Sequence, residues 1–283
     1  MKKYISLMAA AAMLTSCQDI GGALFFAGDG TYEFTNANLD TGYLVDESKI
    51  HRFETYSDSD TIQGVFVGDF AQIQNDTVIV YLHGNGPSMD NFWSSVGVLA
   101  NVGSQHRYGV IMYDYRGYGK STGTTVDAAS MQADYDAVLE WLVDRGLTSD
   151  RMVVFANSLG SLPAGPAAAG NSPIAIEKLV METPQSSADA ILQDATGLSL
   201  PSSMITGYDF DLGANMADYP GALLWMHGTE DDVAPIVNAR AAMSEHQGSH
   251  YVEAVYEGAG HGLRWDISSE EWIRVLHEFM LHE

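Results

Sequence analysis

The sequence predicts an α/β fold, a doubly wound and mostly parallel sheet of eight strands. Three observations lead to this expectation. Short apolar runs typical of strands alternate along the chain with segments of helical pattern. Three central runs, at residues 78–82, 110–113 and 152–155, are apolar throughout, as in strands buried on both faces of a parallel sheet. The chain has 283 residues, which is long enough for one large domain with a substantial core.

The expected elements follow in order along the chain, and the two N-terminal strands are expected to form an antiparallel edge of the sheet. Strands are expected at residues 43–56, 61–67, 77–83, 108–113, 152–156, 178–182, 222–227 and 251–256. Helices are expected near residues 90–102, 127–145, 159–169, 235–247 and 269–282. In such a sheet the ligand site lies beyond the carboxyl ends of the strands, so the loops there are the place to look for chemistry.

The N-terminus resembles a bacterial lipoprotein signal peptide. Two lysines precede an apolar run at residues 5–14, about half the length of a membrane-spanning helix. The run ends in Leu14-Thr15-Ser16-Cys17, which is similar to the lipobox, where the cysteine is lipidated and becomes the first mature residue. The resemblance implies a signal peptide over residues 1–16 and a lipid anchor on Cys17. An ordinary cleaved signal with an incidental cysteine is the alternative.

A lipid anchor implies a place in the bacterial cell envelope. Gln18 rather than Asp follows the cysteine, which by resemblance to enterobacterial sorting favours the outer membrane. Residues 17–42 are rich in Gly, Asn, Asp and Thr and are expected to form a tether, followed by one domain over residues 43–283.

The composition excludes several classes of protein. The chain has 37 acidic and 13 basic residues and a formal net charge of −24, so its surface would repel nucleic acid and anionic lipid headgroups. Its single cysteine excludes an internal disulfide framework and a cysteine-rich zinc site. No His-Glu-x-x-His motif occurs, so neither a metal nor a cofactor is expected.

The window Ala156-Asn157-Ser158-Leu159-Gly160 follows a predicted buried strand and resembles the Gly-x-Ser-x-Gly nucleophile elbow, with alanine in the first glycine place. A sharp turn from strand to helix needs small residues on both sides of the serine. Such a turn would expose the Ser158 hydroxyl at a helix N-terminus. A serine that only caps a helix is the alternative.

The segment His83-Gly84-Asn85-Gly86-Pro87 resembles the His-Gly oxyanion loop of α/β-hydrolases. This resemblance implies that the backbone N–H groups of Asn85 and Leu159 stabilise the oxyanion; a plain glycine-rich loop is the alternative. The segment from Asp114 to Ser121 resembles the Asp-x-Arg-Gly-x-Gly-x-Ser loop of the same superfamily, which is expected to be structural, a tight turn braced by Asp114 and Arg116.

Two further loops complete the pattern. His227-Gly228-Thr229-Glu230-Asp231 resembles the superfamily loop that carries the triad acid and singles out Asp231, with Glu230 and Asp232 as rivals. His261, in a glycine-rich loop after the last strand, is the expected general base. The order Ser158, Asp231, His261 is the α/β-hydrolase order. Over about residues 43–282 the chain therefore resembles that superfamily.

Within the superfamily, Met181-Glu182-Thr183-Pro184 resembles a stretch of the Bem46-like and monoglyceride-lipase-like groups, which have a small lid. The lid is expected at about residues 185–220. Its apolar residues either wall an acyl pocket or form the packing face of a lid helix. These residues are Leu198, Leu200, Met204, Ile205, Tyr208 and Phe210.

Together these resemblances imply a serine hydrolase that cleaves carboxylic esters through an acyl-enzyme, with a small-molecule ester or acyl substrate. A peptidase or thioesterase would use the same triad, because the lid and pocket select the leaving group. A surface lipoprotein that binds without catalysis is the alternative outside the enzyme class. Nothing in the sequence indicates an oligomeric state.

Overall fold

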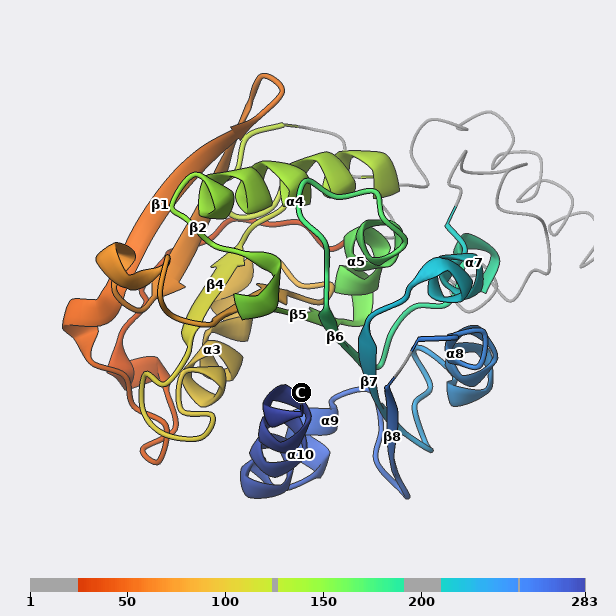
Figure 1. Cartoon of the computed structure of the whole chain (residues 1–283). Coiled ribbons are helices and arrows are strands. Elements are labelled where there is room, and N and C mark those ends of the chain that lie inside the picture. Colours follow the sequence, from red (N-terminus) through yellow and green to blue (C-terminus); the bar gives the residue numbers. More distant parts are fainter. Residues whose placement is uncertain (1–24, 124–126, 191–209, 249, 283) are drawn as a thin grey trace, which may run out of the picture.

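The computed structural model of the protein describes residues 25–123, 127–190, 210–248 and 250–282 (Figure 1). They contain one eight-stranded sheet in the order β1-β2-β4-β3-β5-β6-β7-β8. The strands are β1 (Ile50–Ser57), β2 (Asp60–Val67), β3 (Val78–Leu82), β4 (Gly109–Tyr113), β5 (Met152–Asn157), β6 (Lys178–Glu182), β7 (Ala222–Gly228) and β8 (Tyr251–Tyr256). β2 pairs antiparallel with β1 and β4, and all other pairs are parallel. The predicted mostly parallel sheet with an antiparallel N-terminal edge is confirmed.

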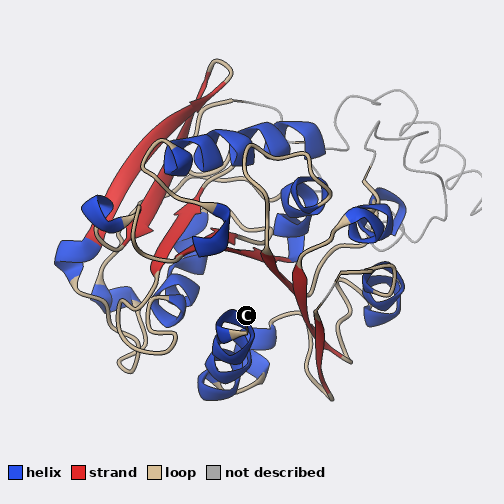
Figure 2. Ribbon diagram, in the orientation of Figure 1, coloured by secondary structure: helices blue, strands red, loops and turns tan. Residues whose placement is uncertain are grey.

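Helices cover both faces of the sheet (Figures 1 and 2). One face carries α4 (Ala128–Val143), α5 (Ser161–Ala168), α7 (Leu212–Asp218) and α8 (Ile236–Met243). The other carries α3 (Trp93–Leu99), α9 (Leu263–Asp266) and α10 (Ser269–Leu281). Short 3₁₀ turns lie at Asn36–Asn38, Glu47–Lys49, Phe70–Gln72, Met89–Phe92, Ser149–Arg151 and Ser158–Gly160.

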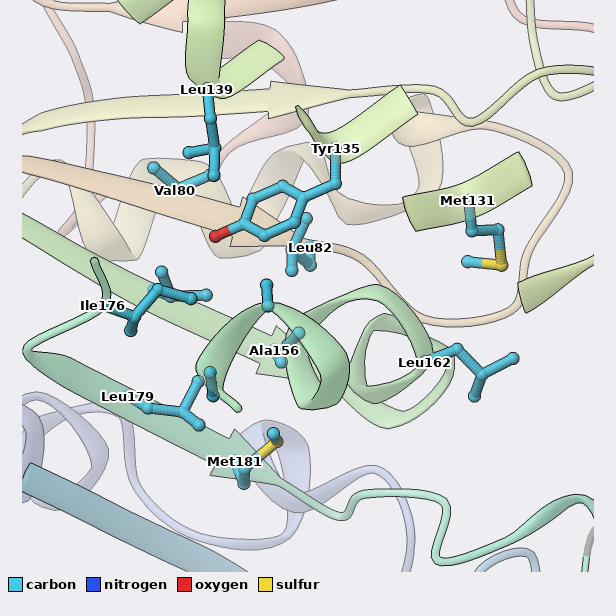
Figure 3. Packing of buried hydrophobic residues seen from close by; sticks show 14 of the residues in the cluster. Val80, Leu82, Met131, Tyr135, Leu139, Ala156, Leu162, Ile176, Leu179 and Met181 are labelled. Carbon is cyan, nitrogen blue, oxygen red and sulfur yellow. The ribbon is translucent and has the colours of Figure 1, made fainter. Parts of the chain in front are cut away.

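The two layers of helices explain why the central strands are apolar at every position. Val80 and Leu82 of β3 pack on the α4 side, whereas Tyr81 between them packs on the α10 side. Figure 3 shows Val80 and Leu82 beside Tyr135 of α4 and Ala156 of β5. Because both faces are covered, each alternate side chain enters one of two hydrophobic cores.

Some boundaries differ from the expectation. The first strand begins at Ile50 rather than at residue 43, because Asp46 caps a 3₁₀ turn over Glu47–Lys49 through the Ser48 N–H. The helix α9 was not expected, and α7 lies in the segment expected to form the lid. Pro166 lies inside α5, where it cannot donate a backbone hydrogen bond, and the helix ends soon after it, at Ala168.

The described part of the expected tether, residues 25–42, packs against the domain instead of leading freely to it. Phe25, Tyr32 and Phe34 are buried in the two cores. Their aromatic rings remove apolar area from water, which offsets the entropy lost on ordering the segment. The burial of these three rings was not predicted, because the segment as a whole is rich in small polar residues.

Other expectations fall outside the described residues. These are the signal peptide over residues 1–16, Cys17, and the lid residues Leu198, Leu200, Met204, Ile205 and Tyr208. In the part of the chain that the structure does describe, none of the helices has the length and apolar character needed to cross a bilayer.

Candidate active site

Ser158 lies at the sharp turn between β5 and α5. Its φ angle is +48°, in the left-handed region that a β-carbon makes unfavourable, so the turn is strained. A β-carbon on Gly160 would overlap the carbonyl oxygen of Leu82 in β3, which explains the need for glycine there. Ala156, in place of the first elbow glycine, is accommodated as a buried residue of β5.

His261 bridges Ser158 and Asp231. Its Nε2 lies 2.9 Å from Ser158 Oγ, and its Nδ1 lies 3.1 and 2.9 Å from the two carboxylate oxygens of Asp231. An ionised carboxylate only accepts hydrogen bonds, so Nδ1 carries the proton and Nε2 accepts from the Ser158 hydroxyl. The fold thus brings together three side chains from the loops after β5, β7 and β8.

The acid beside His261 is Asp231, which is buried, whereas Glu230 and Asp232 are exposed. Two backbone N–H groups of its own loop donate to Oδ1, and His227 Nε2 lies 3.2 Å from Oδ2. Burial alone would raise the pKa of Asp231, but hydrogen bonds from His227 and His261 hold it well below its ordinary value. The carboxylate is therefore ionised at neutral pH.

The loops that carry Asp231 and His261 are tied to each other and to α9. The Glu230 N–H donates to the Ala259 carbonyl at 2.9 Å, which joins the two loops. The Gly260 N–H donates to the Asp266 carboxylate at 2.7 Å, which fixes the residue before the histidine. These backbone bonds fix the loop that carries His261, in addition to the contacts that the imidazole ring makes with Ser158 and Asp231.

The oxyanion loop and the elbow approach each other closely. A β-carbon on Gly84 would lie 2.6 Å from Asn157 Oδ1, so any other residue there would displace the Asn157 side chain beside the elbow. Asn85 and Leu159 both line the cavity next to Ser158. His83 is buried at the end of β3, where its Nδ1 lies 2.8 Å from the Gly84 carbonyl oxygen.

The turn after β4 is braced as expected, but through two separate sets of contacts. Asp114 accepts from the Met89 N–H at 2.7 Å and from the Tyr32 hydroxyl at 2.6 Å. Arg116 donates from two nitrogens to Asp134 of α4, at 2.9 and 2.7 Å. The turn therefore links α4 to the segment that precedes the sheet.

Glu182, at the end of β6, is a buried carboxylate next to the elbow. Its Oε2 accepts from Asn157 Nδ2 at 2.8 Å, and its Oε1 accepts from Trp272 Nε1 of α10 at 2.7 Å. Burial raises the pKa of Glu182, against the opposing effect of these two donors and of the nearby Arg264 and His261. Glu182 therefore connects the residue before Ser158 to the C-terminal helix.

A cavity of about 390 Å³ opens beside Ser158. Its apolar wall belongs to the core on the α4 face and is formed by Phe25, Ala128, Leu159, Leu162, Ala188 and Phe210. Its polar wall is formed by Tyr81, Ser95, Asn157, Glu182 and Arg264. Phe210 is the one residue named for the expected acyl wall that the structure describes, and it lies in that wall and in the core. The cavity can therefore take a molecule with both apolar and polar parts.

Within the described residues, no group of three or more His, Cys, Asp or Glu side chains is placed to hold a metal ion. Sequence reasoning quoted Glu182 only as part of a motif and missed Phe25, Trp272 and Arg264. The signal that could have marked Glu182 is its position as a charged residue at the end of an otherwise apolar strand. Phe25, Trp272 and Arg264 carry no such signal in the sequence, because their partners lie far away along the chain.

The family described as alpha/beta hydrolase fold matches residues 77–218. The chain is 26% identical over 193 residues to the uncharacterized protein YfhR of Escherichia coli O157:H7, an alignment that covers 64% of this chain and 62% of that protein. It is 27% identical over 190 residues to the human alpha/beta hydrolase domain-containing protein 17B, covering 65% of this chain and 59% of the relative. The matched region thus spans about three fifths of the length of these relatives.

Solved structures show the same fold. An esterase of Pyrococcus furiosus superposes with a TM-score of 0.71 at 18% identity, covering 90% of this chain and 97% of the esterase. An esterase of Exiguobacterium antarcticum gives a TM-score of 0.61 at 19% identity, covering 81% of this chain and 99% of that chain. At such identities the likeness concerns the fold alone.

Proposed function

The chain belongs to the alpha/beta hydrolase fold family, and from that premise we propose that it is a serine hydrolase of carboxylic esters. The observation that carries this proposal is the hydrogen-bonded series from Ser158 through His261 to the buried Asp231, at the edge of a partly apolar cavity. The names of its structural relatives, several of them esterases, agree with this reaction.

The mechanism follows from the hydrogen bonds of His261, whose Nδ1 donates to Asp231 and whose Nε2 accepts from the Ser158 hydroxyl. Ser158 Oγ attacks the ester carbonyl while its proton passes to His261 Nε2, and Asp231 stabilises the imidazolium that forms. The backbone N–H groups of Asn85 and Leu159 hold the oxyanion. The C–O bond then breaks, the alcohol takes the proton from His261, and water hydrolyses the acyl-enzyme by the same steps.

The test is the S158A variant assayed with p-nitrophenyl butyrate. We expect a loss of about 10⁶-fold in kcat, because the nucleophile is absent. The matched control is S172A, since the Ser172 hydroxyl donates only within its own turn, to the Ile174 carbonyl. A fluorophosphonate probe should label the wild type and S172A but not S158A. Activity of S158A within a hundredfold of wild type would contradict the proposal.

The same side chains would also cleave thioesters or peptides, so acyl thioesters and aminoacyl amides belong in the substrate panel. A faster rate on either would replace the ester assignment while leaving the triad in place. Failure of the wild type to react with the fluorophosphonate probe would instead favour a protein that binds without catalysis. The Met181-Glu182-Thr183-Pro184 stretch supports a position near the Bem46-like group.

We further propose that the protein is lipidated on Cys17 after removal of residues 1–16 and is held in the bacterial cell envelope, at the outer membrane. The support is the lipobox pattern that ends at the single cysteine. Labelling with radioactive palmitate in a bacterial host should mark the wild type and not C17S. Equal labelling of both would contradict the anchor.

A further inference from the structure

Residues 25–32, which we call the N-terminal strap, lie between two loops at the rim of the site. The Gly28 N–H donates to the Pro87 carbonyl at 2.8 Å, and the Gly28 carbonyl accepts from the Gly119 N–H at 2.8 Å. Pro87 belongs to the oxyanion loop and Gly119 to the turn after β4. The strap therefore joins these two loops through its backbone.

The end of the strap is fixed by two carboxylates. The Thr31 and Tyr32 N–H groups both donate to Asp90, at 2.6 and 2.9 Å. The Tyr32 ring is buried, and its hydroxyl donates to Asp114 at 2.6 Å and accepts from the Lys120 N–H at 2.8 Å. Bonds to charged acceptors are stronger than neutral ones, so the strap is well anchored.

The strap also contacts the residue expected to hold the oxyanion. The Phe26 N–H donates to Asn85 Oδ1 at 2.8 Å, and the Tyr118 hydroxyl donates to the same oxygen at 3.1 Å. A side-chain carbonyl oxygen has two lone pairs, so these two donors use both. The Asn85 side chain is thereby held from two sides, and the backbone that carries its N–H is held with it.

The Phe25 ring forms part of the apolar wall of the cavity. It is 9% exposed and packs in the core on the α4 face, whereas the Phe26 ring is 67% exposed at the rim. An acyl chain that entered the apolar side from Ser158 would share that wall with Phe25, Leu162 and Phe210.

We propose that the N-terminal strap is a working part of the active site, in which the Phe26 N–H positions Asn85 and the Phe25 ring limits the length of the acyl chain. This inference rests on the proposed function and deepens it. The substrate class is an ester with an apolar acyl chain, and the strap selects among chain lengths.

The positioning role is tested by comparing F26P with F26A in the full chain. Both variants lose the ring, but only proline also lacks the N–H that donates to Asn85. We expect kcat of F26P on p-nitrophenyl butyrate to fall about 10-fold or more below that of F26A, with little change in KM, since a misplaced oxyanion donor affects the transition state. Fluorophosphonate titration counts the folded active sites in each sample.

A double-mutant cycle separates this bond from a general disturbance of the fold. If Phe26 acts through Asn85, then F26P added to N85A should cost little beyond N85A alone, because the acceptor is already absent. Equal kcat for F26P and F26A, or losses that multiply in F26P/N85A, would overturn the positioning role.

The selection role is tested with p-nitrophenyl esters of four and ten acyl carbons. In F25A, which opens the wall, we expect the ratio of kcat/KM for the ten-carbon ester to that for the four-carbon ester to rise about 10-fold, and F25L should lie between. A ratio is unaffected by the fraction of inactive protein. An unchanged ratio would overturn the selection role.

The two proposals can fail separately. Retention of activity in S158A would remove the proposed function. Loss of activity in S158A, together with wild-type behaviour of F26P relative to F26A and of F25A, would leave the function standing and remove only the role of the strap.

Discussion

Two regions meet at the site, and they are built differently. The loops after β5, β7 and β8 bring Ser158, Asp231 and His261 together because neighbouring parallel strands end at the same edge of one sheet. The N-terminal strap reaches the same edge through individual polar contacts to residues about 59 positions away, such as Asp90 and Asn85.

This difference has a physical consequence. The position of the strand-end loops follows from the whole core, so a polar substitution there should remove chemistry and leave the fold intact. The position of the strap depends on two buried rings, Phe25 and Tyr32, and on a few hydrogen bonds, each worth about 1.5–3 kcal/mol when an ionised partner is involved. Changes in the strap should therefore be graded, and they should affect stability as well as rate.

The largest expected effect among the loops, after loss of the nucleophile, is that of D231N. An amide in place of the carboxylate favours the wrong imidazole tautomer, so kcat should fall about 10⁴-fold. D232N, the exposed neighbour, is the matched control and should keep wild-type kcat. A fall of less than tenfold in D231N would mean that the loop after β7 does not supply the acid.

The stability of the same variant depends on pH in a defined direction. The pKa of Asp231 is depressed in the folded protein, so its stabilising contribution is complete above the unfolded pKa, near about 3.9, and is lost as pH falls from there through the lower folded pKa. In urea titrations, the difference in free energy of unfolding between wild type and D231N should shrink below about pH 4. A difference that grows there would contradict the assigned ionisation.

An intermediate effect is expected for E182Q, because Glu182 supports the elbow from outside the triad. Its two oxygens accept from Asn157 and Trp272, whereas glutamine offers one acceptor and turns its NH₂ toward the other donor. We expect kcat to fall about 10- to 100-fold as the elbow shifts. Steady-state kinetics on p-nitrophenyl butyrate measure this fall, and an unchanged kcat would contradict the support of the elbow by Glu182.

W272F is the control for that variant. It removes the indole donor on the far side of Glu182 and leaves the carboxylate and its bond to Asn157 in place. The protein should be less stable by about 1–3 kcal/mol, but kcat should fall less than in E182Q, because the acceptor of the Asn157 bond is kept. An equal fall in kcat in both variants would indicate a general change in structure rather than an effect of the bond between Asn157 and Glu182.

The sequence predicted the sheet and the strand-end loops well, for reasons that are local. Apolar runs such as residues 78–82 mark buried strands, and a serine between small residues marks a tight turn. The sequence could single out Asp231 over Glu230 and Asp232 only by resemblance, because the burial of the Asp231 carboxylate is set by the packing of the whole loop against β8.

The strap and the Glu182 contacts could not be predicted in the same way. Phe25 stands in the short apolar run at residues 23–27, and Tyr32 stands between Thr31 and Glu33. Nothing near them in the sequence indicates that Phe25 lines the cavity or that Tyr32 donates to Asp114. Such pairs depend on where distant loops come to lie. They become visible only once the topology has placed those loops.

The smallest effect, and the one that most directly tests the contrast between the regions, is that of Y32F. The variant keeps the buried ring but removes the hydroxyl that Asp114 and the Lys120 N–H share. We expect a loss of about 2 kcal/mol in the free energy of unfolding, measured in urea, and only a few-fold fall in kcat. Y56F is the control, since the Tyr56 ring is exposed on the edge strand β1. A fall of 10³-fold in Y32F, with stability unchanged, would show that the strap acts on the chemistry as directly as the strand-end loops do, and the contrast between the two regions would be lost.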